Sequence, residues 1–219
     1  LDYEAPEALV NVDLGEKVWI FPSQLEAFVK CPLHWFMQAH GGTNKDFEAN
    51  FGTLLHKVLE ETKSINYDDI WSAVESKWYT LEFDAAWIEK QELRKAQRMV
   101  RHLTSYLQDQ KESGYELIGS EVNIEFELGA AKVQGRVDRI EQGPDGQVLI
   151  VDLKTGKYGE AKENPQLGLY QIAFLEGAFE GITDEAKRLQ GAQLLMVNQA
   201  EKYDAKKQDS LEANAELEE

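Results

Sequence analysis

The sequence has little cysteine and no long apolar run. Cys31 is the only cysteine among 219 residues, which excludes a disulfide framework and any metal site built from several thiolates. No segment approaches the roughly 20 consecutive apolar residues that a membrane-spanning helix needs. No secretory segment opens the chain, which begins at Leu1 rather than methionine. We therefore interpret it as an excised domain or processed piece and expect a cytoplasmic location.

Positive charge is also scarce. The chain carries 23 Lys and Arg against 40 Asp and Glu, which gives a formal net charge of -17 at pH 7. This composition argues against a protein that coats DNA by charge alone, because such binding depends on Lys and Arg. It leaves room for a small site in which acidic side chains hold a cation. With 42% hydrophobic residues, the chain can form a core of its own.

The order of the predicted elements indicates an α+β fold in which a helical layer precedes a core of helices and strands. Ser23, with Glu26 three residues later, is a capping box that begins the first helix. Helices are predicted over residues 23–40, 52–62, 67–81, 84–113 and 164–177. Strands are predicted over residues 116–128, 131–141, 147–154 and 193–197. We divide the chain into three parts. Residues 1–22 are a lead-in, residues 23–198 are one domain, and residues 199–219 are an acidic helix or a frayed tail.

The segment Gly143-Pro144-Asp145-Gly146 is a strong turn signal between two predicted strands. Proline suits the second position of a type I turn and glycine the left-handed position after it, which indicates a three-residue hairpin loop with a bulge. Asp138 and Asp152 are equally far from this loop, so we expect them to face each other, with Cβ atoms roughly 4.5–5.5 Å apart. Because side chains alternate along a strand, Lys154 shares the face of Asp152.

Two carboxylates at this separation repel each other, so either one takes up a proton or a cation neutralises both. The strand at residues 148–151 is apolar on both faces, which places the pair at the end of a buried strand. Two interpretations stay open at this point. The aspartates are a cation site, or they are solvent-facing residues at the rim of a hairpin whose register we have misjudged.

A histidine on the second predicted helix favours the cation site. Gly52 lies one turn before His56, at the edge of the apolar face of this helix, and a glycine there lets another backbone approach closely. A lone histidine beside an apolar face is more often a core residue than a ligand. Together with two carboxylates and a lysine, however, His56 makes chemical sense as part of a site.

Four short motifs, in order along the chain, resemble those of the RecB-like branch of the PD-(D/E)xK nucleases. They are Gly52-x-x-x-His56, Gly135-Arg136-Val137-Asp138-Arg139-Ile140, Asp152-Leu153-Lys154-Thr155-Gly156 and Gln166-x-x-x-Tyr170. The opening segment from Ser23 to Pro32 is similar to the start of many of these domains, and the resemblance covers about residues 21 to 198. The segment from Cys31 to Phe36 looks closest to the C-terminal nuclease domain of actinobacterial helicase–nucleases of the AdnAB type.

This resemblance implies a restriction-endonuclease-like core, a mixed sheet flanked by helices, with the added helical layer at its N-terminal side. It implies a divalent-metal-dependent deoxyribonuclease that hydrolyses phosphodiester bonds, as an exonuclease or single-strand endonuclease. Its partners would be single-stranded DNA or DNA ends and a helicase motor, without a membrane, in recombination and repair at the nucleoid. The alternatives are an inactive nuclease-fold module that binds DNA or partner subunits, and an interaction domain whose motifs arose by chance.

The resemblance also assigns roles to individual residues. It implies that His56, Asp138 and Asp152, with the backbone carbonyl of Leu153, bind Mg²⁺ or Mn²⁺. Lys154 would position or activate the attacking water, beside Asp138 and Asp152. Because metal binding needs a neutral histidine, activity should fall as the pH decreases towards about 6.5.

The neighbouring residues of the motifs would contact DNA. Gln166 and Tyr170 would contact DNA or orient the catalytic groups, and the loop with Thr155 and Lys157 would let the DNA backbone approach. Several relatives hold an iron–sulfur cluster through a cysteine at the position of Cys31 and three more near the C-terminus. This chain has no other cysteine, so no cluster forms and we expect Cys31 to be a small buried apolar residue.

Glu121, a stripe of arginines and a set of tryptophans have two interpretations each. Glu121 either supports the site or faces solvent from its strand, and we favour the latter. A stripe of arginines on the long helix either tracks phosphates or is a solvated face paired with acids such as Glu92, which we favour. The tryptophans pack in the helical layer or stack on bases, and helical spacing favours packing. The arginines are Arg94, Arg98 and Arg101, with Lys95 beside them, and the tryptophans are Trp71, Trp78 and Trp87.

Overall fold

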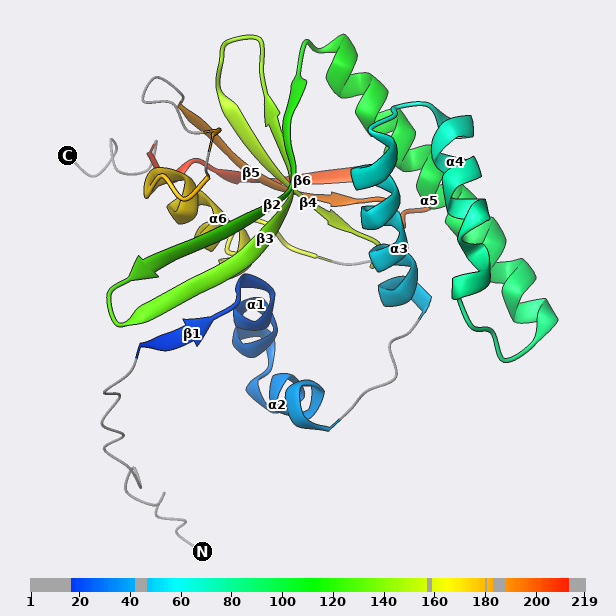
Figure 1. Cartoon of the computed structure of the whole chain (residues 1–219), viewed down its shortest axis with the longest axis horizontal. Coiled ribbons are helices and arrows are strands. Elements are labelled where there is room, and N and C mark those ends of the chain that lie inside the picture. Colours follow the sequence, from blue (N-terminus) through cyan, green and yellow to red (C-terminus); the bar gives the residue numbers. More distant parts are fainter. Residues whose placement is uncertain (1–16, 42–46, 157–158, 180, 183–187, 213–219) are drawn as a thin grey trace, which may run out of the picture.

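A computed structural model describes residues 17–41, 47–156, 159–179, 181–182 and 188–212. Within these residues, six strands form one mixed sheet with helices on both of its faces (Figure 1). In chain order the elements are β1 (Val18–Ile20), α1 (Pro22–Lys30), α2 (Pro32–His40), α3 (Phe47–Thr62), α4 (Tyr67–Ser76), η1 (Trp78–Thr80), α5 (Ala86–Glu112), β2 (Glu116–Leu128), β3 (Ala131–Gln142), β4 (Val148–Lys154), α6 (Pro165–Leu175), β5 (Leu189–Met196) and β6 (Asp204–Asp209). This arrangement confirms the predicted fold class. None of the described helices is long and apolar enough to cross a membrane.

The sheet is built around the long strand β3. β2, β3 and β4 form the predicted antiparallel meander, β5 runs parallel to β4, and β6 pairs antiparallel with β5. β2 follows one edge of β3 along most of its length. The other edge of β3 pairs with β1 at its start, through residues 131–133, and with β4 at its end, through residues 139–142. Between these two pairings the edge of β3 has no strand beside it among the described residues.

The predicted register of β3 and β4 is confirmed. The amide of Gly143 donates to the carbonyl of Gln147 at 2.8 Å, and Gly146 has the left-handed φ of 80° that the turn requires. The ladder then runs from Gln142↔Val148 to Arg139↔Val151, where it ends. Asp138 and Asp152 are the next positions in this register. They therefore lie where β4 parts from β3.

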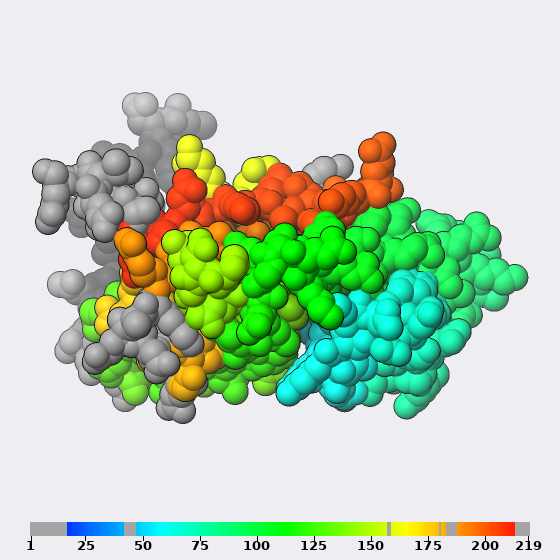
Figure 2. Space-filling view, turned by 90° about the horizontal axis from the view of Figure 1, so that it is seen from above, coloured from blue at the N-terminus to red at the C-terminus, as the bar shows by residue number. Residues whose placement is uncertain are grey.

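Two apolar layers enclose the sheet. Leu149, Val151 and Leu153 of β4 pack towards α3, α4 and α5, whereas Val148 and Ile150 pack towards α6. The predicted burial of β4 on both faces is thus confirmed. Figure 2 shows the helices α3 to α5, in cyan and green, gathered at one end of the molecule beside the strands.

The predicted first helix is two helices, because Pro32 follows Cys31. A residue before proline is driven out of the helical conformation, and Cys31 has extended φ and ψ of -163° and 103°. It lies between α1 and α2 with its thiol side chain exposed, so the expectation of a buried cysteine is wrong. The capping box is also wrong, since α1 begins at Pro22 and Phe21 is its N-cap.

Tertiary pairing also overrides the sequence pattern at both ends. Residues 204–209 form the strand β6 where we expected an acidic helix or tail, and residues 18–20 form β1 within the expected lead-in. Each pairs with an edge of the sheet, and edge strands tolerate charged side chains on their open side. α3 begins at Phe47, earlier than predicted, while α6 begins as predicted, with Asn164 as its N-cap and Pro165 at its first position.

Candidate functional site

The site begins at the point where β3 and β4 diverge. The backbone N–H of Leu153 donates to Asp138 Oδ2 at 2.7 Å, so a carboxylate replaces the carbonyl that a continued ladder would supply. Beside this point α1 packs against β3, and a Cβ added at Gly135 would lie 2.9 Å from the ring of Pro22. Gly135, in the second predicted strand, therefore lets α1 fill the free edge of β3.

One cluster of possible ligands joins three elements at this edge. His56 Nδ1 of α3 lies 3.1 Å from Glu121 Oε1 of β2 and 3.6 Å from Asp138 Oδ1 of β3. One ligand atom from each of these residues lies within 4.8 Å of the others. The predicted meeting of His56 and Asp138 is therefore found. Glu121 is an additional member of the cluster.

Glu121 does not face solvent as we had favoured. Its side chain is only 8% exposed, and its backbone φ is 52°, a conformation that is uncommon for a residue other than glycine. In the register of β2 and β3 it falls between the pairs Ser120↔Arg139 and Val122↔Val137, opposite Asp138. Pairing residues outward from the tight β2–β3 turn would have placed Glu121 opposite Asp138. The same procedure, applied to the β3–β4 turn, had related Asp152 to Asp138.

A second cluster surrounds Lys154. Its Nζ lies 3.0 Å from Asp152 Oδ2, 2.9 Å from Gln166 Oε1 and 3.4 Å from Glu26 Oε2. Glu26, which the sequence analysis had treated as a helix cap, also accepts from Asn164 Nδ2 at 3.1 Å. α1 therefore contributes a carboxylate to the site that no local pattern indicated.

Gln166 and Tyr170 orient these groups. Gln166 Nε2 donates to Asp152 Oδ1 and to the hydroxyl of Tyr170, both at 2.8 Å, and that hydroxyl donates to the carbonyl of Arg136 at 2.9 Å. Both side chains are buried. Gln166 and Tyr170 thus fix α6 to the free edge of β3, and Gln166 holds Asp152 and Lys154 in place.

Thr155, which directly follows β4, is tied to α3. Its buried hydroxyl donates to the carbonyl of Glu48 at 2.8 Å, and a Cβ added at Gly52 would lie 2.7 Å from this oxygen. The close approach expected at Gly52 is therefore real, with a threonine side chain as the neighbour. Lys157 lies outside the described residues.

The pKa values of these groups are interdependent. Burial and the charge of Asp152 raise the pKa of Asp138 to about 7. Burial also raises the pKa of Asp152, against the attraction of Lys154. Burial alone would lower the pKa of His56, but the charges of Asp138 and Glu121 outweigh it and raise this pKa to about 9. Similarly, Asp152 and Glu26 outweigh burial and raise the pKa of Lys154, which therefore stays protonated.

The side chains fit a divalent cation. The predicted ligands were His56, Asp138, Asp152 and the carbonyl of Leu153; the structure gathers His56 and Asp138 with Glu121 and sets Asp152 beside them. Asp152 Oδ2 is a buried oxygen without a hydrogen-bond partner, although it faces the ammonium of Lys154. A cavity of about 20 Å³ adjoins His56, Glu121 and Asp138, enough for one water-sized particle. Oxygen and imidazole donors of this kind suit Mg²⁺ and Mn²⁺.

Comparison with known proteins gives independent information on the family and the fold of the chain. The sequence matches the family model described as "PD-(D/E)XK nuclease superfamily" over residues 21–219. A crystal structure from Eubacterium rectale, named "Putative exonuclease", has a TM-score of 0.50 at 13% identity, covering 98% of this chain and 81% of that chain. The similarity to that structure concerns the fold alone. The crystal structure of SSO0001 has a TM-score of only 0.27 at 12% identity, over 84% of this chain and 78% of that chain. A search of curated protein sequences gives no match.

Proposed function

The chain belongs to the PD-(D/E)XK nuclease superfamily, and from this premise we propose that it is a divalent-metal-dependent DNA nuclease. It would hydrolyse phosphodiester bonds in single strands or at DNA ends. The observation that carries the proposal is the cluster of His56, Glu121 and Asp138 beside the pair Asp152 and Lys154. The four motifs favour a place in the RecB-like branch, and the segment from Cys31 to Phe36 favours a relation to the AdnAB type.

The side chains of the site would have different roles in phosphodiester hydrolysis. His56, Glu121, Asp138 and Asp152 would hold Mg²⁺ or Mn²⁺, which supplies Lewis acidity and lowers the pKa of a bound water. Lys154 stays protonated because Asp152 and Glu26 raise its pKa, so it acts through its charge and its N–H groups. It would hold a phosphate oxygen or the attacking water. The buried amide of Gln166 keeps that ammonium in position.

A catalytically inactive module that binds DNA or partner subunits is the second candidate. Every side chain of the predicted metal and catalytic set is present, with His56 and Asp138 in one cluster and Lys154 beside Asp152. This favours the active enzyme. Binding of single-stranded DNA without cleavage at any Mn²⁺ concentration would favour the inactive module instead.

Asp152→Asn tests the proposed activity. The wild type should cleave single-stranded DNA with Mn²⁺ and lose all cleavage with a chelator, and Asp152→Asn should lower the rate by about 100-fold or more, because a neutral amide holds a cation poorly. Asp145→Asn, in the exposed turn, is the matched control and should keep the wild-type rate. Equal rates for Asp152→Asn and the wild type would refute the assignment.

We also propose that α1 and α2 carry the contact with a helicase motor, which would supply the DNA affinity that a charge of -17 does not. Val29 of α1 is 63% exposed, and Leu33 and Met37, one turn apart on α2, are 68% and 57% exposed. Large exposed apolar patches of this kind mark interaction surfaces. With such a partner, the nuclease would act on DNA ends during recombination and repair, in the cytoplasm at the nucleoid.

Acidic substitutions on this face test the contact. Leu33→Asp with Met37→Asp should abolish binding to a purified UvrD/Rep-like motor in calorimetry, since burying a carboxylate in an apolar interface is costly. Leu117→Asp with Leu128→Asp, which replaces two exposed leucines of β2, is the control and should bind as the wild type does. Unchanged binding by the first pair of substitutions, or no binding by any protein, would exclude the proposed contact.

A further inference from the structure

One face of α5 is positively charged although the chain as a whole is strongly acidic. Side chains three and four positions apart share a helix face. On α5 such a set lines a concave region of about 600 Å³. It consists of Trp87, Lys90, Gln91, Arg94, Lys95 and Arg98. Among the described residues, four cations and no acid line this region, which we call the α5 groove.

The sequence analysis had expected acidic neighbours to neutralise the arginine stripe, but the structure shows this for only part of it. Lys95 pairs with Glu48 and Glu92, and Arg101 lies over the ring of Tyr67. Lys90, Arg94 and Arg98 form no ion pair among the described residues. The Nε of Arg98 is buried and has no hydrogen-bond partner. Within the described part of the chain, the groove therefore holds three cations that form no ion pair, which favours an anionic ligand.

Trp87 adds an aromatic surface to this charge. Whereas Trp71 and Trp78 pack in the helical layer as predicted, Trp87 is 69% exposed. Its neighbours in the groove are the cations Lys90 and Arg94. An exposed tryptophan beside cations is typical of surfaces on which the bases of a single strand stack while its phosphates are neutralised.

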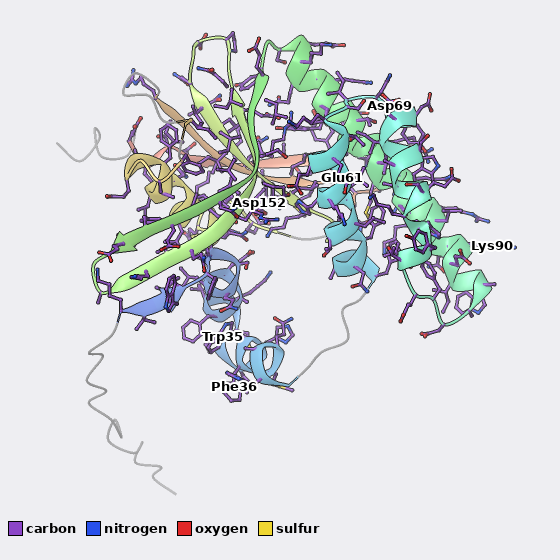
Figure 3. The ribbon with its side chains drawn as sticks, in the orientation of Figure 1. Trp35, Phe36, Glu61, Asp69, Lys90 and Asp152 are labelled. Carbon is purple, nitrogen blue, oxygen red and sulfur yellow. The ribbon has the colours of Figure 1, made fainter. Side chains whose placement is uncertain are left out.

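The groove and the nuclease site meet at the first turn of α3. Lys95 donates to the carboxylate of Glu48, and the hydroxyl of Thr155 donates to the carbonyl of the same Glu48. Thr155 follows Lys154 in the chain. Figure 3 shows Lys90 towards the outer end of α5, away from Asp152. Glu48 therefore connects the groove to Thr155, the residue after Lys154.

We propose that the α5 groove binds the phosphate backbone of single-stranded DNA away from the scissile bond, with a base stacked on Trp87. The ligand follows from the proposed function, on which this inference rests. The strand is single because a base inside a duplex does not present its face to a side chain. The groove would hold the substrate in a protein whose overall charge repels it.

Charge reversal in the groove tests the proposal. The affinity of the protein for a fluorescent single strand longer than about 16 nucleotides is measured by anisotropy in chelator, at several salt concentrations. Lys90→Glu with Arg94→Glu should raise the Kd about tenfold or more. The salt dependence should weaken by a slope of about 1.4, which is about 0.7 for each of two phosphates. Trp87→Ala should raise the Kd about fivefold or more.

The control changes the same charge elsewhere. Lys111→Glu with Lys207→Glu replaces two exposed cations outside the groove and should leave the Kd within about twofold of the wild type. An unchanged Kd and salt slope in the groove variant would overturn the proposal, as would the absence of measurable binding by the wild type. Equal affinity for a duplex, together with indifference to Trp87→Ala, would overturn the single-strand assignment.

Cleavage of DNA of two lengths separates this inference from the nuclease assignment. With Mn²⁺, the groove variant should cut oligonucleotides shorter than about 4 nucleotides at the wild-type rate and long strands several-fold more slowly at low DNA concentration. Equal rates on both lengths would refute the groove and leave the nuclease standing. A wild type that binds DNA through the groove and never cuts it would refute the nuclease and leave the groove standing.

Discussion

Lys154→Ala is expected to lower the rate of DNA cleavage by about 100- to 1,000-fold while leaving DNA affinity nearly unchanged. Among the described residues, the ammonium of Lys154 is the cation that forms an ion pair with Asp152, at 3.0 Å, and Gln166 and Glu26 hold it there. A charge fixed in this way costs no reorganisation when negative charge develops on the phosphate. Its loss should therefore affect the chemical step rather than binding. Single-turnover cleavage of a labelled single strand measures that step directly.

Two further variants make this result specific. Lys154→Arg keeps the charge but not the compact shape of the ammonium, so it should recover only part of the lost rate. Lys111→Ala, at an exposed position on α5, removes a lysine far along the chain from the site and should cleave as the wild type does. A Lys154→Ala protein with the wild-type single-turnover rate would show that the lysine merely balances the charge of its acidic neighbours.

The affinity for Mn²⁺ is expected to rise steeply as the pH increases from about 6 to about 9. The metal-free protein holds protons on Asp138, with a pKa of about 7, and on His56, with a pKa of about 9. A cation must displace both, so its affinity should increase by about tenfold per pH unit for each proton displaced. Calorimetry in buffers of different ionisation enthalpy would count these protons.

The stability of the metal-free protein should change in the opposite direction. Asp138 and His56 both have folded-state pKa values above their ordinary values of 3.8 and 6.5. Their contribution to stability is therefore full below those ordinary values and is lost as the pH rises through about 7 and about 9. Thermal unfolding should show the Tm falling over this range, with Mn²⁺ restoring it most at high pH.

His56→Gln provides the control for this linkage. It removes the proposed ligand with the highest pKa, so the increase in Mn²⁺ affinity should then follow Asp138 alone, whose pKa rises without the charge of His56. The sequence placed the loss of activity near the ordinary histidine pKa, and the structure moves it upward because Asp138 and Glu121 hold the proton on His56. An affinity for Mn²⁺ that is constant between about pH 6 and 9 would contradict the proposed ligands.

The sequence alone determined the parts of the site that depend on local chemistry. The turn from Gly143 to Gly146 fixes the register of β3 and β4, because its glycine has the positive φ that other residues avoid. Asn164 and Pro165 fix the start of α6, and alternation along the strand places Asp152 and Lys154 on one face. Each of these signals acts over a few residues, so a pattern can report it.

Only the tertiary structure decided which groups complete the site and how they titrate. The hairpin register relates Glu121 to Asp138, but His56 lies 65 residues from Glu121 and Glu26 lies 128 residues from Lys154, so no local pattern relates these partners. They meet because the pairing of β4 with β3 ends at Val151 and Arg139, and because α1 fills the free edge of β3 beyond that point. The pKa of a buried acid or histidine depends on every charge around it, and those charges come together only when the sheet and helices pack.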